Sequence, residues 1–190
     1  MKFPQNYYIR RKIFVLFGAK FHLYNTADQM IGFSKQKAFK LKEDIRVFSD
    51  ETMTKEQLFI KARNVIDFGA SYDVTDSETG KVCGMWRRKG FKSMLKDTWE
   101  LYQNEMMIGR LSEDSTFLAI VRRFTGLGGW IPQTYHLRLN DGRLIATYKQ
   151  RFNPFVFKID VMSLVCDESD FDKLVAAGAV LLTAIEGRQK

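Results

Sequence analysis

The chain has 190 residues, of which 45% are apolar, and a formal net charge of +8 at pH 7. This length and composition predict a single domain that spans residues 1–190 and buries a sizeable core, and the sequence contains no low-complexity linker and no internal repeat. The positive charge suits an anionic partner, either a membrane surface or nucleic acid, although proteins without such a partner also carry it.

The cysteines and the N-terminal segment indicate where in the cell the protein is located. The two cysteines, Cys83 and Cys166, lie far apart in the chain and do not indicate a disulfide framework. The apolar run at 13–17 is too short for the core of a secretory signal, and no cleavage motif of small residues follows it. We therefore expect a cytoplasmic protein with reduced thiols.

The first part of the chain is a series of expected strands. Apolar residues alternate in the windows 7–17, 20–24, 29–38, 40–48 and 57–66. In the second window, alternation places Phe21 and Leu23 inward and His22 outward. Residues 50–54 are polar and are expected to form a turn. The high aromatic content, with 16 Phe, seven Tyr and three Trp, also favours strands.

Three hairpins are expected in the second part. The first covers residues 71–88, with turn chemistry supplied by Asp76, Ser77 and Gly80. The second joins 99–103 to 106–111 around Asn104 and Glu105. The third joins 133–139 to 144–151 at an Asp-Gly turn signal.

Two further elements complete this part of the chain. Residues 115–124 have helical spacing after a Ser start, which predicts one short helix, followed by a loop. The last strand carries Phe155, Phe157, Ile159 and Val161 on one face.

The C-terminal stretch 170–187 is expected to be a helix that is apolar on every side. Its polar side chains between 171 and 185 are Asp172, Lys173 and Thr183. A helix that is apolar all round is buried all round. A membrane anchor is the rival interpretation, but the largely apolar stretch from 174 to 185 has 12 residues and falls short of the roughly 20 that a span needs.

The strand pattern and the helix together predict the fold class. About a dozen strands at short spacing are typical of sandwiches and barrels, and the absence of alternating strands and helices argues against a parallel sheet. A sandwich has no room for a fully buried helix, whereas a closed barrel has. We therefore predict a mainly β protein: a closed antiparallel barrel of about 12 strands around the C-terminal helix.

The chain resembles a known family. The resemblance is carried by YDVTDSETGKVCGMWRRKG (72–90), by DTWELYQNEMMIGRL (97–111) and by the terminal helix DKLVAAGAVLLTAI. These segments are similar to LURP-one-related proteins of the tubby C-terminal superfamily, close to its phospholipid-scramblase-like branch. The Cys-rich and Pro-rich segments typical of animal scramblases are absent, as is a tubby signature near the C-terminus.

Basic clusters are the candidate binding residues. One cluster places five positive charges within ten residues, with no acid until Asp97: Arg87, Arg88, Lys89, Lys92 and Lys96. A second comprises Lys35, Lys37, Lys40, Lys42 and Arg46, and a third Arg10, Arg11 and Lys12. Phosphate head groups favour such Arg and Lys groups, but charge runs are also common as solvated surface. In a strand, Arg87 and Lys89 face one way and Arg88 the other.

The resemblance implies a non-enzymatic binding module for anionic phospholipid or phosphoinositide head groups at the membrane surface, without a membrane-spanning segment. It also implies two alternatives, which are a scramblase-like lipid-translocating activity and a nucleic-acid-binding role in transcription. The sequence does not determine the oligomeric state.

No metal, cofactor or catalytic site is expected. The two histidines, His22 and His136, and the two cysteines lack the spacing of a zinc site, and no nucleophile or nucleotide-binding motif is present. The acidic run 167–172 sits where scramblases have a proposed calcium site. Helix capping and the helix dipole also explain that run, and the sequence leaves the calcium question open.

Overall fold

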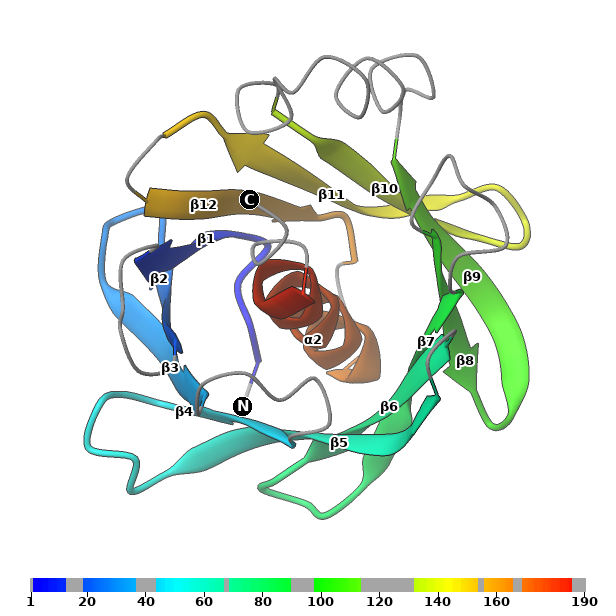
Figure 1. The fold of residues 1–190 in the computed structure, drawn as a ribbon, viewed down its shortest axis with the longest axis horizontal. Coiled ribbons are helices and arrows are strands. Elements are labelled where there is room, and N and C mark those ends of the chain that lie inside the picture. Colours follow the sequence, from blue (N-terminus) through cyan, green and yellow to red (C-terminus); the bar gives the residue numbers. More distant parts are fainter. Residues whose placement is uncertain are drawn as a thin grey trace.

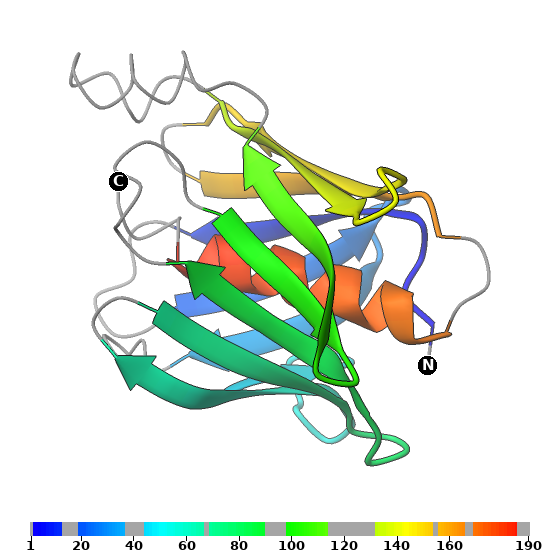
Figure 2. The same ribbon diagram turned by 90° about the vertical axis from the view of Figure 1, so that its right-hand side faces the viewer.

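The computed structural model describes residues 2–12, 19–36, 44–66, 69–89, 98–113, 132–153, 156–165 and 169–185. Within these residues, twelve strands form one closed antiparallel barrel, and helix α2 (Ser169–Ile185) runs through its interior (Figures 1 and 2). The predicted fold class is therefore confirmed. The helix predicted at 115–124 and the last two residues of the helix predicted at 170–187 lie outside the described residues.

Each strand of the barrel pairs with its neighbours in the sequence, and β1 closes the sheet against β12. The strands are β1 (Asn6–Lys12), β2 (Ala19–Asn25), β3 (Met30–Gln36), β4 (Ile45–Phe48), β5 (Glu56–Ile66), β6 (Gly69–Asp76), β7 (Val82–Lys89), β8 (Thr98–Gln103), β9 (Met106–Glu113), β10 (Thr134–Leu139), β11 (Leu144–Arg151) and β12 (Val156–Ser163). Closure leaves the sheet without the unpaired edge strands that promote aggregation.

Every second side chain along a strand points inward, and these side chains fill the barrel interior. Phe21 and Leu23 of β2 are fully buried, as are Leu58 and Ile60 of β5. Tyr135 and Leu137 of β10 also point inward, as predicted, and Leu139 packs at the border of the core. These inward side chains belong to one hydrophobic cluster that also contains the side chains of α2, so the barrel has a single core.

The turns between strands use residues that tolerate a left-handed backbone. Asn104 and Glu105, between β8 and β9, have φ values of 49° and 64°. This pair of positive φ angles is the signature of the hairpin turns that match strand twist. Gly80 (φ 71°) and Gly142 (φ 88°) serve the β6–β7 and β10–β11 hairpins.

Helix α2 is buried on all sides, as its sequence predicts. Every side chain from Leu174 to Ala184 is at most 1% exposed. Two barrel side chains also donate hydrogen bonds to helix carbonyls: the indole Nε1 of Trp86 to Leu174 at 3.0 Å, and the hydroxyl of Tyr148 to Val175 at 3.1 Å. These contacts add directional bonds to a hydrophobic interface.

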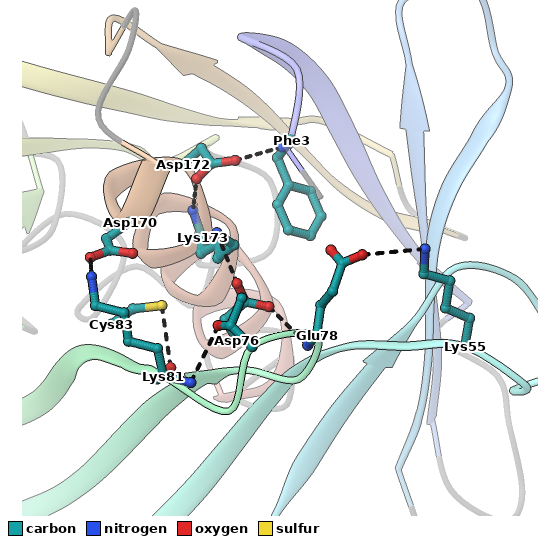
Figure 3. A network of polar contacts seen from close by, with 10 residues as sticks. Phe3, Lys55, Asp76, Glu78, Lys81, Cys83, Asp170, Asp172 and Lys173 are labelled. Atoms are coloured by element: carbon teal, nitrogen blue, oxygen red, sulfur yellow. Dashed lines mark hydrogen bonds and ion pairs between the residues drawn. The ribbon is translucent and has the colours of Figure 1, made fainter.

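Polar contacts anchor the first turn of α2 to the β6–β7 hairpin and to the N-terminal segment (Figure 3). Asp172 accepts a hydrogen bond from the backbone N–H of Phe3 at 2.7 Å, and Lys173 forms an ion pair with Asp76 at 3.2 Å. Lys81 pairs with Asp170 at 2.5 Å. The N-terminal segment, the β6–β7 hairpin and the first turn of α2 therefore meet at one end of the barrel.

Candidate functional site

The three basic clusters do not converge on one surface among the residues that the structure describes. Arg87 and Lys89 lie on β7, Arg10 lies on β1, and Lys35 and Arg46 lie on β3 and β4. In the closed barrel, β1 is half-way round from β7 (Figure 1). Lys37, Lys40, Lys42, Lys92 and Lys96 are outside the described residues.

Of the three consecutive basic residues on β7, Arg87 and Lys89 point to one side of the sheet and Arg88 to the other, as strand alternation predicts. Arg87 and Lys89 are exposed on the outer face of the barrel. Arg88 is half-buried, and its guanidinium lies over the ring of Trp99, a core residue, at 6.0 Å. Only two of these three cations therefore face solvent from the outer wall.

A third cation joins Arg87 and Lys89 through the sheet register. Arg87 is opposite Glu100 of β8, and Glu100 is opposite Arg110 of β9. The Lys89 ammonium lies 2.7 Å from the Glu100 carboxylate, and Arg110 lies 3.7 Å from it. We call this surface of β7, β8 and β9 the basic wall; it comprises Arg87, Lys89 and Arg110 around Glu100.

Glu100 is the hidden centre of the basic wall. It is on the outward phase of β8, yet only 2% of it is exposed because the surrounding cations and Tyr102 cover it. Burial alone would raise the pKa of Glu100, but hydrogen bonds from Lys89 and Tyr102, with the charges of Lys89 and Arg110, hold the pKa below its usual value. The carboxylate is therefore charged at neutral pH and holds the cations in place.

Tyr102 links Arg87 to the same carboxylate. The Arg87 guanidinium stacks on the Tyr102 ring at 4.8 Å and donates to its hydroxyl at 3.2 Å. That hydroxyl donates to Glu100 at 3.0 Å. Burial and the bond to Glu100 raise the pKa of Tyr102, so the hydroxyl keeps its proton. The Arg87 side chain is thus oriented while it remains exposed.

A surface pocket of about 330 Å³ adjoins the basic wall on the side of β5 and β6. Arg87 and Tyr102 line it together with Arg63, Asp73 and Met85. Arg63 and Asp73 form an ion pair at 2.6 Å. The pocket therefore has charges of both signs, whereas the basic wall beside it is mainly positive.

The profile of the LURP-one-related family matches residues 30–183, which is most of the chain and includes the basic wall. The chain belongs to the LURP-one-related family. No curated protein and no solved structure matches it.

A second basic surface of this LURP-one-related barrel lies on β11, β12 and β1. Arg151 and Lys158 both lie over the ring of Tyr8, at 5.5 and 5.4 Å, and Tyr8 also stacks on Tyr24 at 5.2 Å. Asp160 pairs with Arg151 at 2.6 Å. The aromatic faces on this side are occupied by the protein's own side chains.

The acidic run before α2 is engaged with the protein itself where the structure describes it. Asp170 pairs with Lys81, and Asp172 accepts from the backbone of Phe3 and Lys173. Among the described residues, no group of three or more His, Cys, Asp or Glu side chains could hold a metal ion. Asp167 and Glu168 are outside the described part of the chain.

No helix in the described ranges combines the length and the apolar composition that a membrane crossing requires.

Cys83 is a free, buried thiol, and burial raises its pKa to about 11. A thiol with that pKa is largely protonated at neutral pH, and the thiolate is the reactive form.

Sequence reasoning missed Glu100, Tyr102 and Arg110 as members of the site. Each is unremarkable in the sequence, because a lone Glu, Tyr or Arg on an alternating strand is usually solvated surface. The expected pairing of 99–103 with 106–111 around Asn104 and Glu105 was not enough to find them. With that turn fixed, an unbroken register would place Glu100 opposite Gly109, and the register shift between Leu101 and Tyr102 brings Arg110 opposite Glu100 instead.

Proposed function

We propose that this LURP-one-related protein is a non-enzymatic, cytoplasmic binding module that docks peripherally on anionic phospholipid head groups through the basic wall. The observation that carries the proposal is the convergence of Arg87, Lys89 and Arg110 on one buried carboxylate. Lys89 and Arg110 share this carboxylate, and Arg87 is linked to it through the Tyr102 hydroxyl, so the three cations leave an excess of two positive charges on a short stretch of sheet.

The arrangement suits an anionic surface because the cations are both exposed and positioned. The side chains of Lys89 and Arg110 are 59% and 54% exposed. Glu100 and Tyr102 restrict the side chains of Lys89 and Arg87, so less conformational entropy is lost when a phosphate binds. Each basic residue near an anionic membrane contributes about 1 kcal/mol to binding.

Lys92 and Lys96 follow Lys89 in the chain and remain part of the proposed contact. Arg88 does not, since its side chain is directed over Trp99 on the inner side of the wall. Phosphoinositides and other anionic phospholipids share the phosphate chemistry that this set of cations favours.

The two alternatives fit the geometry less well. A scramblase-like activity through α2 would need a helix that is free to meet lipid, and α2 forms the centre of the barrel core. Nucleic-acid binding by stacking needs open aromatic faces. On the second basic surface, Tyr8 is already covered by Arg151, Lys158 and Tyr24.

Co-sedimentation with vesicles tests the proposal. We compare phosphatidylcholine vesicles with vesicles that also contain an anionic lipid, using wild type and the double variant Arg87→Gln/Arg110→Gln. Loss of two basic residues at about 1 kcal/mol each predicts a roughly thirtyfold weaker binding to anionic vesicles.

The matched control is Arg10→Gln/Lys158→Gln, which removes the same net charge from β1 and β12, across the barrel. If the basic wall docks, this control binds like wild type. An equal loss in both double variants would mean that net charge alone drives binding. Negligible binding of wild type to every anionic vesicle would refute the proposal.

A further inference from the structure

The surface pocket beside the basic wall has the chemistry of a site for a ligand that carries both charges. We call it the Asp73 pocket, and its polar lining is formed by Arg63, Asp73, Arg87, Tyr102, Asn104 and Glu105. Its volume of about 330 Å³ lies at the lower end of the range of about 300–1,000 Å³ found for small-molecule sites.

Asp73 has unused capacity to accept a hydrogen bond. Its Oδ2 accepts from Arg63 at 2.6 Å. Its Oδ1 is buried and has no hydrogen-bond partner among the described residues. Because the Asp73 carboxylate lines the pocket, a bound ammonium group can pair with it beside Arg63.

The other side of the Asp73 pocket is suited to an anion. Asp73 is opposite Met85 in the sheet, and Arg87 follows two residues after Met85 on the same outer face. Diagonal neighbours of this kind are about 7–8 Å apart, so one compact head group can reach both. Glu105, in the β8–β9 turn, adds a second carboxylate to the acidic side.

Two exposed apolar side chains favour a lipid over a free metabolite as the ligand. Val82 lines the pocket and is 58% exposed, and Met106, which follows Glu105 in the chain, is 68% exposed. Both side chains can enter the interfacial region of a membrane while the cations of the basic wall contact its head groups.

We propose that the Asp73 pocket recognises the head group of an anionic aminophospholipid of the phosphatidylserine type, with its ammonium at Asp73 and Glu105 and its phosphate at Arg87. This inference rests on the proposed function, because it names the lipid class that the same wall selects. Polyphosphorylated head groups lack an ammonium, and Asp73 and Glu105 repel their charge.

The experiment compares vesicles that contain phosphatidylserine with vesicles that contain the same mole fraction of phosphatidylglycerol. Both lipids carry one net negative charge, but only phosphatidylserine has an amine. For wild type we expect a preference for phosphatidylserine of about three- to fivefold, the ratio that one exposed ion pair of up to about 1 kcal/mol supports. Asp73→Asn should abolish this preference.

The control variant is Asp160→Asn on β12. Asp160 pairs with Arg151 Nε at 2.6 Å, as Asp73 pairs with Arg63 Nε at 2.6 Å, so the two substitutions remove matched ion pairs and change the net charge equally. Asp160→Asn should keep the preference. Glu105→Gln provides a second test of the acidic side in case Asp73→Asn does not fold, and it should weaken the preference.

The outcomes separate the two proposals. Equal binding of wild type to the two vesicle types overturns the aminophospholipid inference and leaves the proposed function standing. Binding to neither type overturns both. Release of the protein from phosphatidylserine vesicles by soluble glycerophosphoserine, but not by glycerophosphoglycerol, supports recognition of the head group itself.

Discussion

Lys173 of α2 and Asp76 at the end of β6 form an ion pair at 3.2 Å, although neither side chain is more than 8% exposed. Asp76 also accepts a hydrogen bond from the backbone N–H of Glu78 at 3.0 Å through its other oxygen. The pair therefore ties the buried helix to the β6–β7 hairpin (Figure 3). It also explains how a charged residue is accommodated at the start of an otherwise apolar helix.

Replacing Lys173 with Met should destabilise the fold strongly, because it leaves Asp76 buried without its counterion. The expected loss is about 3–5 kcal/mol in the free energy of unfolding, measured in urea. The double variant Lys173→Met/Asp76→Asn removes both charges and should regain part of that loss. Lys81→Met, at the exposed pair with Asp170, is the control and should change stability little. A small effect of Lys173→Met would contradict this role.

Gly178 of α2 should not tolerate a side chain. A Cβ at this position would lie 2.9 Å from the Trp86 ring and 3.0 Å from the Tyr148 hydroxyl. Gly to Ala in a helix usually stabilises by about 1 kcal/mol, but overpacking a core costs about 1–3 kcal/mol. We expect Gly178→Ala to lower the thermal midpoint. Gly32→Ala, whose contacts would be no closer than 3.4 Å, should be better tolerated.

Glu100→Gln should change the stability of the fold and the affinity for anionic vesicles in opposite directions. It removes the anion that Lys89 and Arg110 share, so the fold loses stability while the wall gains one positive charge. We expect a lower thermal midpoint together with tighter binding to anionic vesicles. A parallel decrease in both quantities would mean that the cations of the basic wall do not face the lipid.

Acid should destabilise the protein partly through Glu100. The pKa of Glu100 in the fold lies below its ordinary value of 4.5, so its contribution to stability is present above that pH and is lost as the pH falls through the folded value. Asp76 also contributes stability that is lost in acid. Burial alone would raise its pKa, but hydrogen bonds from Glu78 and Lys173 outweigh burial and lower the pKa from 3.8. Burial raises the pKa of Asp172, which acts in the opposite direction: its contribution is present below pH 3.8 and is lost as the pH rises through the folded value.

Urea midpoints measured between about pH 6 and pH 3 check this behaviour. Glu100→Gln should flatten the decline relative to wild type, because one of the carboxylates that lose stability on protonation is gone. An unchanged slope in that variant would show that folding does not lower the pKa of Glu100, and a steeper decline would show that folding raises it.

The fold could be predicted because its signals are local. Alternation alone placed Phe21, Leu23 and Leu137 inside, and all are fully buried. The helix could be assigned to the barrel interior because it has no polar face, and a helix of this kind needs partners on every side.

The site could be predicted only in part because it depends on the relation between strands. Alternation separated Arg87 and Lys89 from Arg88, but the approach of Lys89 and Arg110 to Glu100 depends on register across three strands. Register shifts such as the one between Val74 and Thr75 leave no clear trace in the residue types. The bond from Phe3 to Asp172 joins residues 169 positions apart, which no local pattern encodes.

The most direct test of the account asks which side of the barrel meets the membrane. An environment-sensitive fluorophore is attached at Met106→Cys, beside the basic wall, or at Met162→Cys on β12, in a Cys166→Ser background. Both positions are well exposed, and Cys83 is buried with a pKa of about 11, so it should not react at neutral pH. With anionic vesicles, we predict a blue shift and a brighter signal at position 106 and no change at position 162. A shift at position 162 alone, or at neither position while the protein co-sediments, would contradict docking through the basic wall.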